Sequence, residues 1–216
     1  MLPHVTRASR AAEIGSGGGR VAVRLARAVG ALALFDVSAK MLDRARAAVD
    51  AATQSCGPPS RTAPTAMPPS FGVVEYHHVT GDGDASPGDD FSDDVARSYP
   101  LSARAAFDLV VCFDVMVHMD LHTIFRCLKR IRALLKPPHG RAFISTANLA
   151  APDGWARFAK QARFTVGGFY FVTPDAVRLL VDKAGLVVLS EQTPDATNTY
   201  YNRDYLALLG LPQNST

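Results

Sequence analysis

Glycines alternate with other residues near the start of the chain, in the run Glu13-Ile-Gly15-Ser-Gly17-Gly-Gly19. Glycine leaves no side chain where a turn must approach a ligand, and it tolerates a positive φ. A helix that begins after such a turn directs its free N–H groups and the positive end of its dipole toward the same place. Asp36 ends the next apolar run, where a carboxylate can accept hydrogen bonds from a ribose. The spacing therefore predicts a nucleotide site.

The glycine spacing does not fit a dinucleotide site. The G-x-G-x-x-G pattern needs a third glycine where helix and strand pack closely. Counted from Gly15, that position is Arg20. An NAD-type oxidoreductase is therefore disfavoured.

The form E-x-G-x-G-x-G instead resembles motif I of the class I S-adenosylmethionine-dependent methyltransferases. The run FDVSAKMLDRAR at 35–46 strengthens the resemblance, because it is similar to the family's D-x-S-x-x-M-L-x-x-A-R segment. The run FDLVVCFDVMVHM at 107–119 looks like the family's fourth strand, and LKRIRALLKPPHGRAFIS at 128–145 looks like the helix, turn and fifth strand after it. The resemblance extends from about Arg10 to Leu211.

The resemblance implies a site for S-adenosylmethionine, which is released as S-adenosylhomocysteine. The turn beneath the methionine part of the cofactor would consist of Glu13, Gly15, Ser16, Gly17 and Gly19. Asp36 would bind the ribose, Val37 and Met41 would flank the adenine, Asp82 with Gly83 would meet the adenine amino group, and Phe113 with Asp114 would border the sulfonium. For Asp82 a plain turn residue is the alternative, and Met41 could equally belong to a helix core.

A general base is needed only if the acceptor must lose a proton, because the sulfonium is already an activated methyl donor. His118 and Asp114 are the candidate catalytic residues, since both follow the predicted fourth strand. The alternative for His118 is a residue that only orients its loop. The six histidines of the chain show no metal-ligand spacing, so no metal site is predicted.

Strand and helix patterns alternate along the chain, which predicts an α/β fold with a parallel sheet covered on both faces. Together with the resemblance this gives a Rossmann-like, doubly wound sheet of seven strands, mostly parallel with an antiparallel final strand. The strands are predicted at 10–14, 31–35, 72–80, 107–113, 141–146, 186–191 and 205–211, and the helices at 18–29, after Ser38, at 120–136 and from Thr173 to Gly185. The last two strands are expected to form a hairpin with no helix between them.

The chain is expected to be a single methyltransferase domain over 1–216, because its length and 48% hydrophobic content suit one core. Irregular loops are expected at 56–70 and 84–105 and a substrate-facing segment at 148–172. That segment concentrates aromatic residues in a chain with only 8% of them: Trp155, Phe158, Phe164, Phe169, Tyr170 and Phe171. They could line an apolar pocket or pack the segment onto the sheet. The adjacent pair Gly167-Gly168 slightly favours a mobile, ligand-facing element.

The composition of the chain bears on whether it binds nucleic acid or a membrane, and on the compartment in which it works. The net charge of +3 comes from scattered arginines, which gives no specific nucleic-acid signal. No apolar run is long enough for a membrane helix. The three cysteines, Cys56, Cys112 and Cys127, lack C-x-x-C spacing, which favours reduced thiols and a cytoplasmic location.

The predicted function is therefore methyl transfer to an oxygen or nitrogen nucleophile. A small-molecule acceptor leads, because the signatures of nucleic-acid methyltransferases are absent from the sequence. Two alternatives remain open at this point: a protein methyltransferase, and a catalytically silent protein of the same fold that acts as a binding or regulatory partner.

Overall fold

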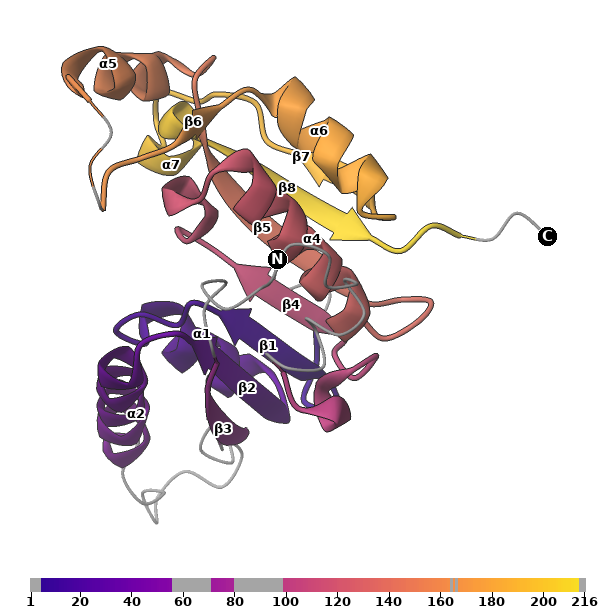
Figure 1. Ribbon diagram of the computed structural model, residues 1–216. Coiled ribbons are helices and arrows are strands. Elements are labelled where there is room, and N and C mark those ends of the chain that lie inside the picture. Colours follow the sequence, from indigo (N-terminus) through magenta and orange to yellow (C-terminus); the bar gives the residue numbers. More distant parts are fainter. Residues whose placement is uncertain (1–4, 56–70, 80–98, 164, 166, 214–216) are drawn as a thin grey trace. The chain divides into compact units, whose positions relative to one another are not determined.

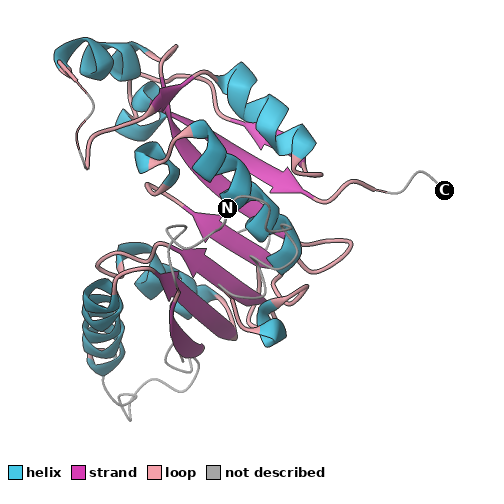
Figure 2. Ribbon diagram, in the orientation of Figure 1, coloured by secondary structure: helices cyan, strands magenta, loops and turns pink. Residues whose placement is uncertain are grey.

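The computed structural model describes residues 5–55, 71–79, 99–163, 165 and 167–213. The chain forms two compact units, residues 1–81 and residues 82–216. Helices and strands alternate within both units (Figures 1 and 2). The predicted α/β class with a mostly parallel sheet is confirmed, and the prediction of a single domain stays a prediction.

The first unit is a parallel β–α–β–α–β arrangement. It contains β1 (Arg10–Ile14), α1 (Arg20–Ala28), β2 (Ala31–Asp36), α2 (Ala39–Gln54) and β3 (Val73–His78). Both β1 and β3 pair in parallel with β2, so the strand order is β3-β2-β1. Ile14 and Asp36 therefore end neighbouring strands at the same edge, where ligands bind in open α/β sheets.

The buried face of α1 agrees with the sequence pattern in part. Of the residues that the pattern places inward, Leu25 and Val29 are buried, whereas Val21 is half-buried and Ala22 and Ala26 complete the buried face. The helix begins at Arg20, and Val29 follows it as a buried C-cap. Small alanines on the inner face let the helix pack closely, so packing rather than side-chain size decides which residues are buried. Helix α2 begins as predicted, because the Ser38 side chain accepts a hydrogen bond from the Met41 N–H.

The second unit contains the remaining elements. These are η3 (Leu101–Ala103), β4 (Leu109–Cys112), η4 (Met116–His118), α4 (Leu121–Leu134), β5 (Arg141–Asn148), α5 (Pro152–Lys160), β6 (Phe171–Val172), α6 (Pro174–Lys183), β7 (Val187–Glu191), α7 (Thr199–Arg203) and β8 (Asp204–Gly210). The strand order is β4-β5-β8-β7, and β6 pairs with the end of β5. Strand β4 is parallel to β5, whereas β8 is antiparallel to both β5 and β7. The predicted antiparallel final strand is confirmed.

Three details of the second unit differ from the prediction. The short helix α7 lies between β7 and β8. Asn198 caps this helix by accepting hydrogen bonds from two following N–H groups. The two-residue β6 was not expected and brings the described strands to eight. The helical turn η3 lies inside the segment 84–105 that was predicted to be irregular. Segment 56–70 and the rest of 84–105 up to residue 98 lie outside the described residues.

The core of the second unit is centred on β4, whose four residues are all buried. Helix α4 covers it with Ile124, Leu128, Ile131 and Leu134, as its apolar spacing predicted. Leu121, which the same pattern placed inward, is exposed because it occupies the first helical turn beyond the end of the strand. Thr173 precedes α6 as predicted, but its side chain makes no capping hydrogen bond.

Candidate functional site

The glycine run forms a turn that only glycine can follow without strain. Gly15, Gly17 and Gly19 have φ values of 72°, 50° and 83°, in the left-handed region. The Gly15 N–H donates to the Phe35 carbonyl at 2.7 Å, which ties the end of β1 to β2. A Cβ atom at Gly19 would lie 2.9 Å from the Ala45 Cα, so the absence of a side chain lets α1 and α2 approach. At Gly17 a Cβ would meet no atom within 4 Å, so the space beside the turn is open.

Asp36 holds this turn in place. One carboxylate oxygen, Oδ2, accepts the Gly17 N–H at 3.1 Å, and the other, Oδ1, accepts the Ser38 N–H at 2.9 Å. The structure therefore brings Asp36 and the glycines together as predicted. Each of its oxygens has a second lone pair for another hydrogen bond.

Glu13 is a buried carboxyl group beside that turn. Its side chain is 3% exposed, and Oε2 has no hydrogen-bond partner among the residues that the structure describes. Burial, and to a smaller extent the negative charge of Asp36, raise the pKa of Glu13 to about 8, against the lowering effect of Arg20. An uncompensated buried carboxyl oxygen is costly. This acid therefore has hydrogen-bonding capacity that the folded chain itself does not use.

The other candidate residues of the first unit differ in exposure. Val37 is 63% exposed, which is unusual for a large aliphatic side chain directly after a buried strand. Met41 is half-buried on α2, and Ser16 is buried with an Oγ that has no hydrogen-bond partner. Asp82 and Gly83 lie outside the described residues.

In the second unit, Asp114 follows the buried strand β4 in a strained conformation. Its φ is 62°, in the left-handed region that residues other than glycine rarely adopt. The Asp114 N–H donates to the Ser145 Oγ at 2.8 Å, and its Oδ1 accepts from the Arg203 Nη2 at 3.0 Å. Phe113 lies beside Phe143 and Tyr200, with ring centroids 6.0 and 5.0 Å away. Backbone strain of this kind is common at functional sites.

Arg203 was not among the predicted site residues. It ends α7, and its Nε donates to the Asp204 Oδ1 at 2.7 Å while the same guanidinium contacts Asp114. The guanidinium also lies over the rings of Phe169 and Tyr200, 5.0 and 5.1 Å from their centroids. Asp204 is almost fully buried, and burial raises its pKa above the usual range, against the lowering effect of Arg203. One arginine thus joins two acids and two aromatic rings.

His118 is exposed at the end of η4 but is fixed on one side. Its Nδ1 lies 3.0 Å from the Gly168 carbonyl oxygen, and its ring meets Phe169 edge to face at 5.3 Å. A carbonyl can only accept, so Nδ1 carries the proton and the Nε2 of the neutral ring keeps its lone pair. The predicted base candidate is therefore anchored through Nδ1, and its Nε2 has no hydrogen-bond partner among the described residues.

The aromatic residues of 148–172 divide into two groups. Phe169 is buried and Phe171 half-buried, with ring centroids 5.9 Å apart. Trp155 and Phe158 lie on α5 and are exposed, 5.6 Å apart. Phe158 also meets Phe171 edge to face at 5.5 Å. Packing thus accounts for Phe169, whereas α5 presents aromatic surface to solvent. Phe164 lies outside the described residues.

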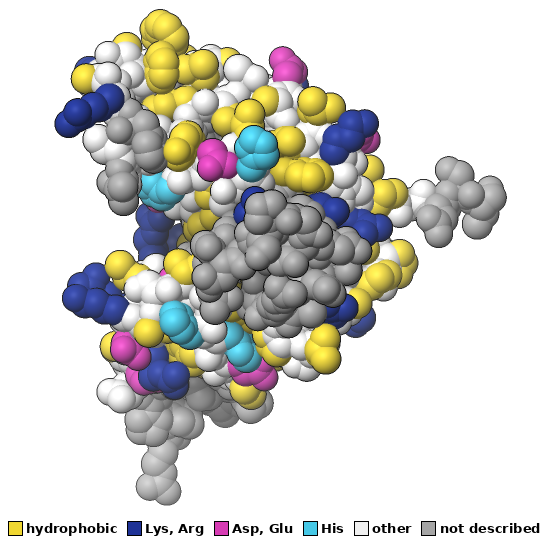
Figure 3. Space-filling model, viewed as in Figure 1, with side chains coloured by type: hydrophobic (Ala, Val, Ile, Leu, Met, Phe, Trp, Pro, Cys, Tyr) yellow, Lys and Arg dark blue, Asp and Glu magenta, His cyan; other side chains and the backbone are white. Residues whose placement is uncertain are grey.

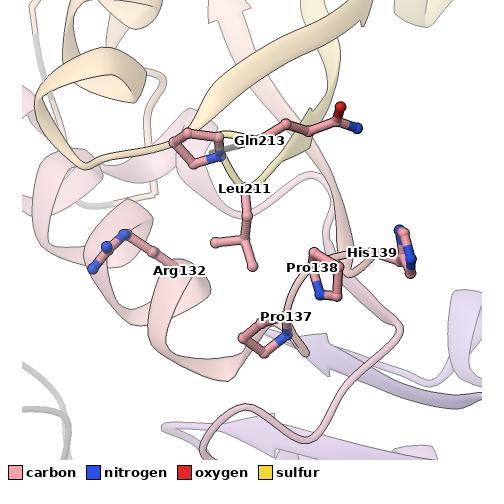
Figure 4. A pocket seen from close by; sticks show the side chains of 7 residues that line it. Arg132, Pro137, Pro138, His139, Leu211 and Gln213 are labelled. Carbon is pink, nitrogen blue, oxygen red and sulfur yellow. The ribbon is translucent and has the colours of Figure 1, made fainter. Parts of the chain in front are cut away.

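Two cavities of the second unit lie at opposite ends of its sheet. One, of about 570 Å³, lies where β5 begins and β8 has ended, and Figure 4 shows Leu211 pointing toward Pro137 and Pro138 there. The other, of about 490 Å³, lies among the segments that follow β4, β5 and β6. Ligands of open α/β sheets bind at the carboxyl ends of the parallel strands. The first cavity lies at the opposite end, where β5 begins, so it is not the expected ligand site.

The described residues contain no group of three or more His, Cys, Asp or Glu side chains that could hold a metal ion. Cys112 and Cys127 are buried free thiols, as predicted. In the part of the chain that the structure describes, no helix is long and apolar enough to cross a membrane.

The chain belongs to a family of methyltransferases, because the sequence profile described as "Methyltransferase domain" matches residues 6–191. This confirms the resemblance to the class I S-adenosylmethionine-dependent methyltransferases, and the protein is an enzyme of that class. An NAD-type oxidoreductase is not supported. A search of curated proteins found no match.

Solved structures share the fold at low sequence identity. The chain is similar to the magnesium protoporphyrin IX methyltransferase of Synechocystis PCC 6803 with bound S-adenosylhomocysteine, at 15% identity and a TM-score of 0.61, covering 98% of this chain and 75% of that one. It is similar to the N-methyltransferase NodS of Bradyrhizobium japonicum WM9 in complex with S-adenosyl-L-homocysteine, at 15% identity and a TM-score of 0.57, covering 95% and 79%. It is also similar to the mitomycin 7-O-methyltransferase MmcR, at 17% identity and a TM-score of 0.60, covering 95% and 49%.

Proposed function

We propose that the chain transfers a methyl group from S-adenosylmethionine to an oxygen or nitrogen atom of a small molecule. The observation that carries the proposal is the turn at Gly15–Gly19, with open space beside it and an unused buried carboxyl oxygen on Glu13. Two proteins of similar fold are named for small-molecule acceptors, a porphyrin and mitomycin, and this analogy supports the acceptor class.

The residues of the first unit fit the cofactor. The turn from Glu13 to Gly19, with Ser16, would hold the aminobutyrate part through its backbone and the Glu13 carboxyl group. Asp36 would accept the ribose hydroxyls with its remaining lone pairs, and Val37 with Met41 would cover the adenine. When bound, S-adenosylmethionine supplies an activated methyl group on a sulfonium and leaves as S-adenosylhomocysteine. For Asp82, Gly83 and Phe113 the family roles stay predictions.

We assign the role of general base to His118. Its Nδ1 proton is bound by the Gly168 carbonyl, so Nε2 is the atom that would take a proton from the acceptor. Asp114 is less suited to this role, because its carboxylate is already engaged by the Arg203 guanidinium at 3.0 Å. Asp114 would instead accept a hydrogen bond. The buried thiols of Cys112 and Cys127 suit a cytoplasmic, reducing compartment.

Calorimetric titration with S-adenosylhomocysteine tests the cofactor site. We expect Asp36→Ala to weaken binding by about 1–3 kcal/mol, because a charged hydrogen-bond acceptor is lost. Asp43→Ala removes an exposed acid from the same region and is the matched control, with affinity unchanged. NAD should not bind. Equal affinities of the two variants would mean that the ribose lies elsewhere.

Incubation with a radiolabelled methyl donor and fractionated cell extract tests the acceptor class. Label in small molecules is expected, and label confined to protein would favour the protein methyltransferase. With the acceptor in hand, His118→Gln should lower kcat by about 100-fold without weakening S-adenosylhomocysteine binding. His139→Gln, which changes an exposed histidine at the opposite end of the sheet, is the control and should keep its kcat. A full rate in His118→Gln would remove the base role.

A further inference from the structure

The cavity of about 490 Å³ lies entirely within the second unit. It is bounded by the beginning of α4, the residue after β5, the strand β6 and the first turn of α6 (Figure 1). Its lining residues are Asp120, Leu121, His122, Leu149, Tyr170, Phe171, Val172, Thr173 and Ala176. In Figure 3, hydrophobic side chains gather on the face that carries α4 and α6, with histidine and acidic side chains among them.

The cavity lies at the edge of the sheet where ligands are expected. Strands β4 and β6 both run parallel to β5, so their carboxyl ends point the same way. Leu149 follows β5 and Thr173 follows β6, and both line the cavity. Ligands of open α/β sheets bind outside these strand ends.

Backbone hydrogen bonds fix the floor of the cavity and join it to the segment that orients His118. The Leu149 N–H donates to the Val172 carbonyl at 2.9 Å. The Tyr170 N–H donates to the Val117 carbonyl at 2.8 Å, directly before His118. Gly168, which accepts the His118 Nδ1–H, is two residues from Tyr170. The same short segment therefore shapes the cavity and holds the proposed base.

The lining indicates what the cavity could bind. Most of it is aliphatic or aromatic, from Leu121, Leu149 and Tyr170 to Ala176, whereas the polar side chains come from the two helix ends. Asp120 accepts the Thr123 N–H at 2.8 Å, and this bond lowers the pKa of Asp120, so the rim carries a negative charge. Thr173 makes no capping bond, so its hydroxyl and the first turn of α6 can donate to a ligand oxygen.

We propose that this cavity is the acceptor pocket and that it binds an uncharged aromatic small molecule with a hydroxyl group. The proposal rests on the proposed function, since it names the acceptor of that reaction. The volume suits a small molecule, because ligand pockets commonly measure about 300–1,000 Å³. The apolar walls disfavour sugars, peptides and other strongly polar ligands, and the Asp120 carboxylate opposes the attraction that the two helix N-termini would have for an anion.

Binding of 2-naphthol to the full chain, in the presence of S-adenosylhomocysteine, tests the pocket by equilibrium dialysis. Ala176→Phe places a ring in the cavity from a half-exposed position, and we expect its affinity for 2-naphthol to fall at least tenfold. Leu179→Phe adds the same ring to an exposed site on the same helix and should bind 2-naphthol normally. Naphthalene-2-sulfonate, which has the same ring system with a negative charge, should bind at least tenfold more weakly than 2-naphthol.

A second variant covers the case in which Ala176→Phe does not fold. Leu121→Ser removes an apolar wall at an exposed position, and 2-naphthol affinity should fall severalfold. Normal 2-naphthol binding by both folded cavity variants, or equal binding of the sulfonate, would overturn the proposal. Titration with S-adenosylhomocysteine keeps the two hypotheses apart. If only the pocket proposal is wrong, the unaltered chain still binds S-adenosylhomocysteine. If the unaltered chain does not bind S-adenosylhomocysteine, the proposed function is wrong.

Discussion

The candidate sites of the two units consist of different kinds of chemical group. In the first unit the site is mostly backbone: a glycine turn, held by one carboxylate, within the short stretch from Glu13 to Ser38. In the second unit it is a cluster of charged and aromatic side chains. The Arg203–Asp114 pair there joins residues 89 positions apart in the sequence. The first site is local in sequence and the second is assembled by the fold.

This difference has energetic consequences. A backbone turn depends on which residues can adopt its φ values, so most side-chain changes near it are tolerated and changes of glycine are not. A cluster of buried charges depends on every partner, because removal of one leaves another unpaired in a poorly solvated place. We therefore expect the largest single losses of stability in the second unit.

The largest effect is expected at Arg203. Arg203→Met replaces the aliphatic part of the side chain but leaves Asp204 buried without its partner, and the free energy of unfolding should fall by about 3–5 kcal/mol. The Arg203 side chain is 14% exposed. Urea denaturation measures the change.

Arg178→Met is the matched control for that variant. Arg178 pairs with Glu191 at 2.8 Å, but the arginine side chain is 43% exposed, so its loss should cost less than about 1 kcal/mol. Because the unpaired acid causes the penalty, adding Asp204→Asn to Arg203→Met should restore part of the stability. If Arg203→Met and Arg178→Met lower the free energy of unfolding by similar amounts, burial does not decide how much an ion pair contributes to stability here.

The contrast also explains what could be predicted from the sequence. The glycine turn, Asp36 and the Ser38 cap were predictable, because neighbours in the sequence make their contacts. The buried strand β4 and the inner face of α4 followed from apolar periodicity. On α1 the buried Leu25 was predicted, whereas the buried Ala22 and Ala26 were missed, because alanines carry little periodic signal.

Arg203 could not be placed in this way. Its partners come from the residues after β4, from α7 and from the segment before β6, and no local pattern links those segments. The helix α7 itself had one usable signal, Asn198 as a cap before a tyrosine pair. The cavity at the beginnings of α4 and α6 also depends on tertiary packing.

The next effect concerns Glu13, a buried acid of the backbone-built site. Its pKa is raised from 4.5 to about 8 in the folded chain. Between those pH values the folded chain keeps a proton that the unfolded chain loses, so the free energy of unfolding falls as the pH rises. We expect a fall of about 2–4 kcal/mol from pH 5 to pH 8 due to this group.

Glu13→Gln should flatten that part of the pH dependence, because the amide does not titrate. Denaturation at pH 5, 6.5 and 8 measures it. Glu75→Gln changes a half-exposed acid on β3 and should leave the slope as it is in the unaltered chain. If the free energy of unfolding of Glu13→Gln still falls between pH 5 and pH 8, another group titrates in that range. Glu13 would then not be the source of the pH dependence.

The smallest effect is expected within the glycine turn, where two adjacent positions differ. Gly19 has a φ of 83°, and a Cβ there would press on the Ala45 Cα at 2.9 Å. Gly18 has neither a positive φ nor an atom within 4 Å of its Cβ position. Gly19→Ala should therefore lower the free energy of unfolding by about 1–3 kcal/mol, whereas Gly18→Ala should change it by less than about 0.5 kcal/mol. Equal losses in urea denaturation would mean that flexibility, and not the left-handed turn against α2, is what these glycines provide.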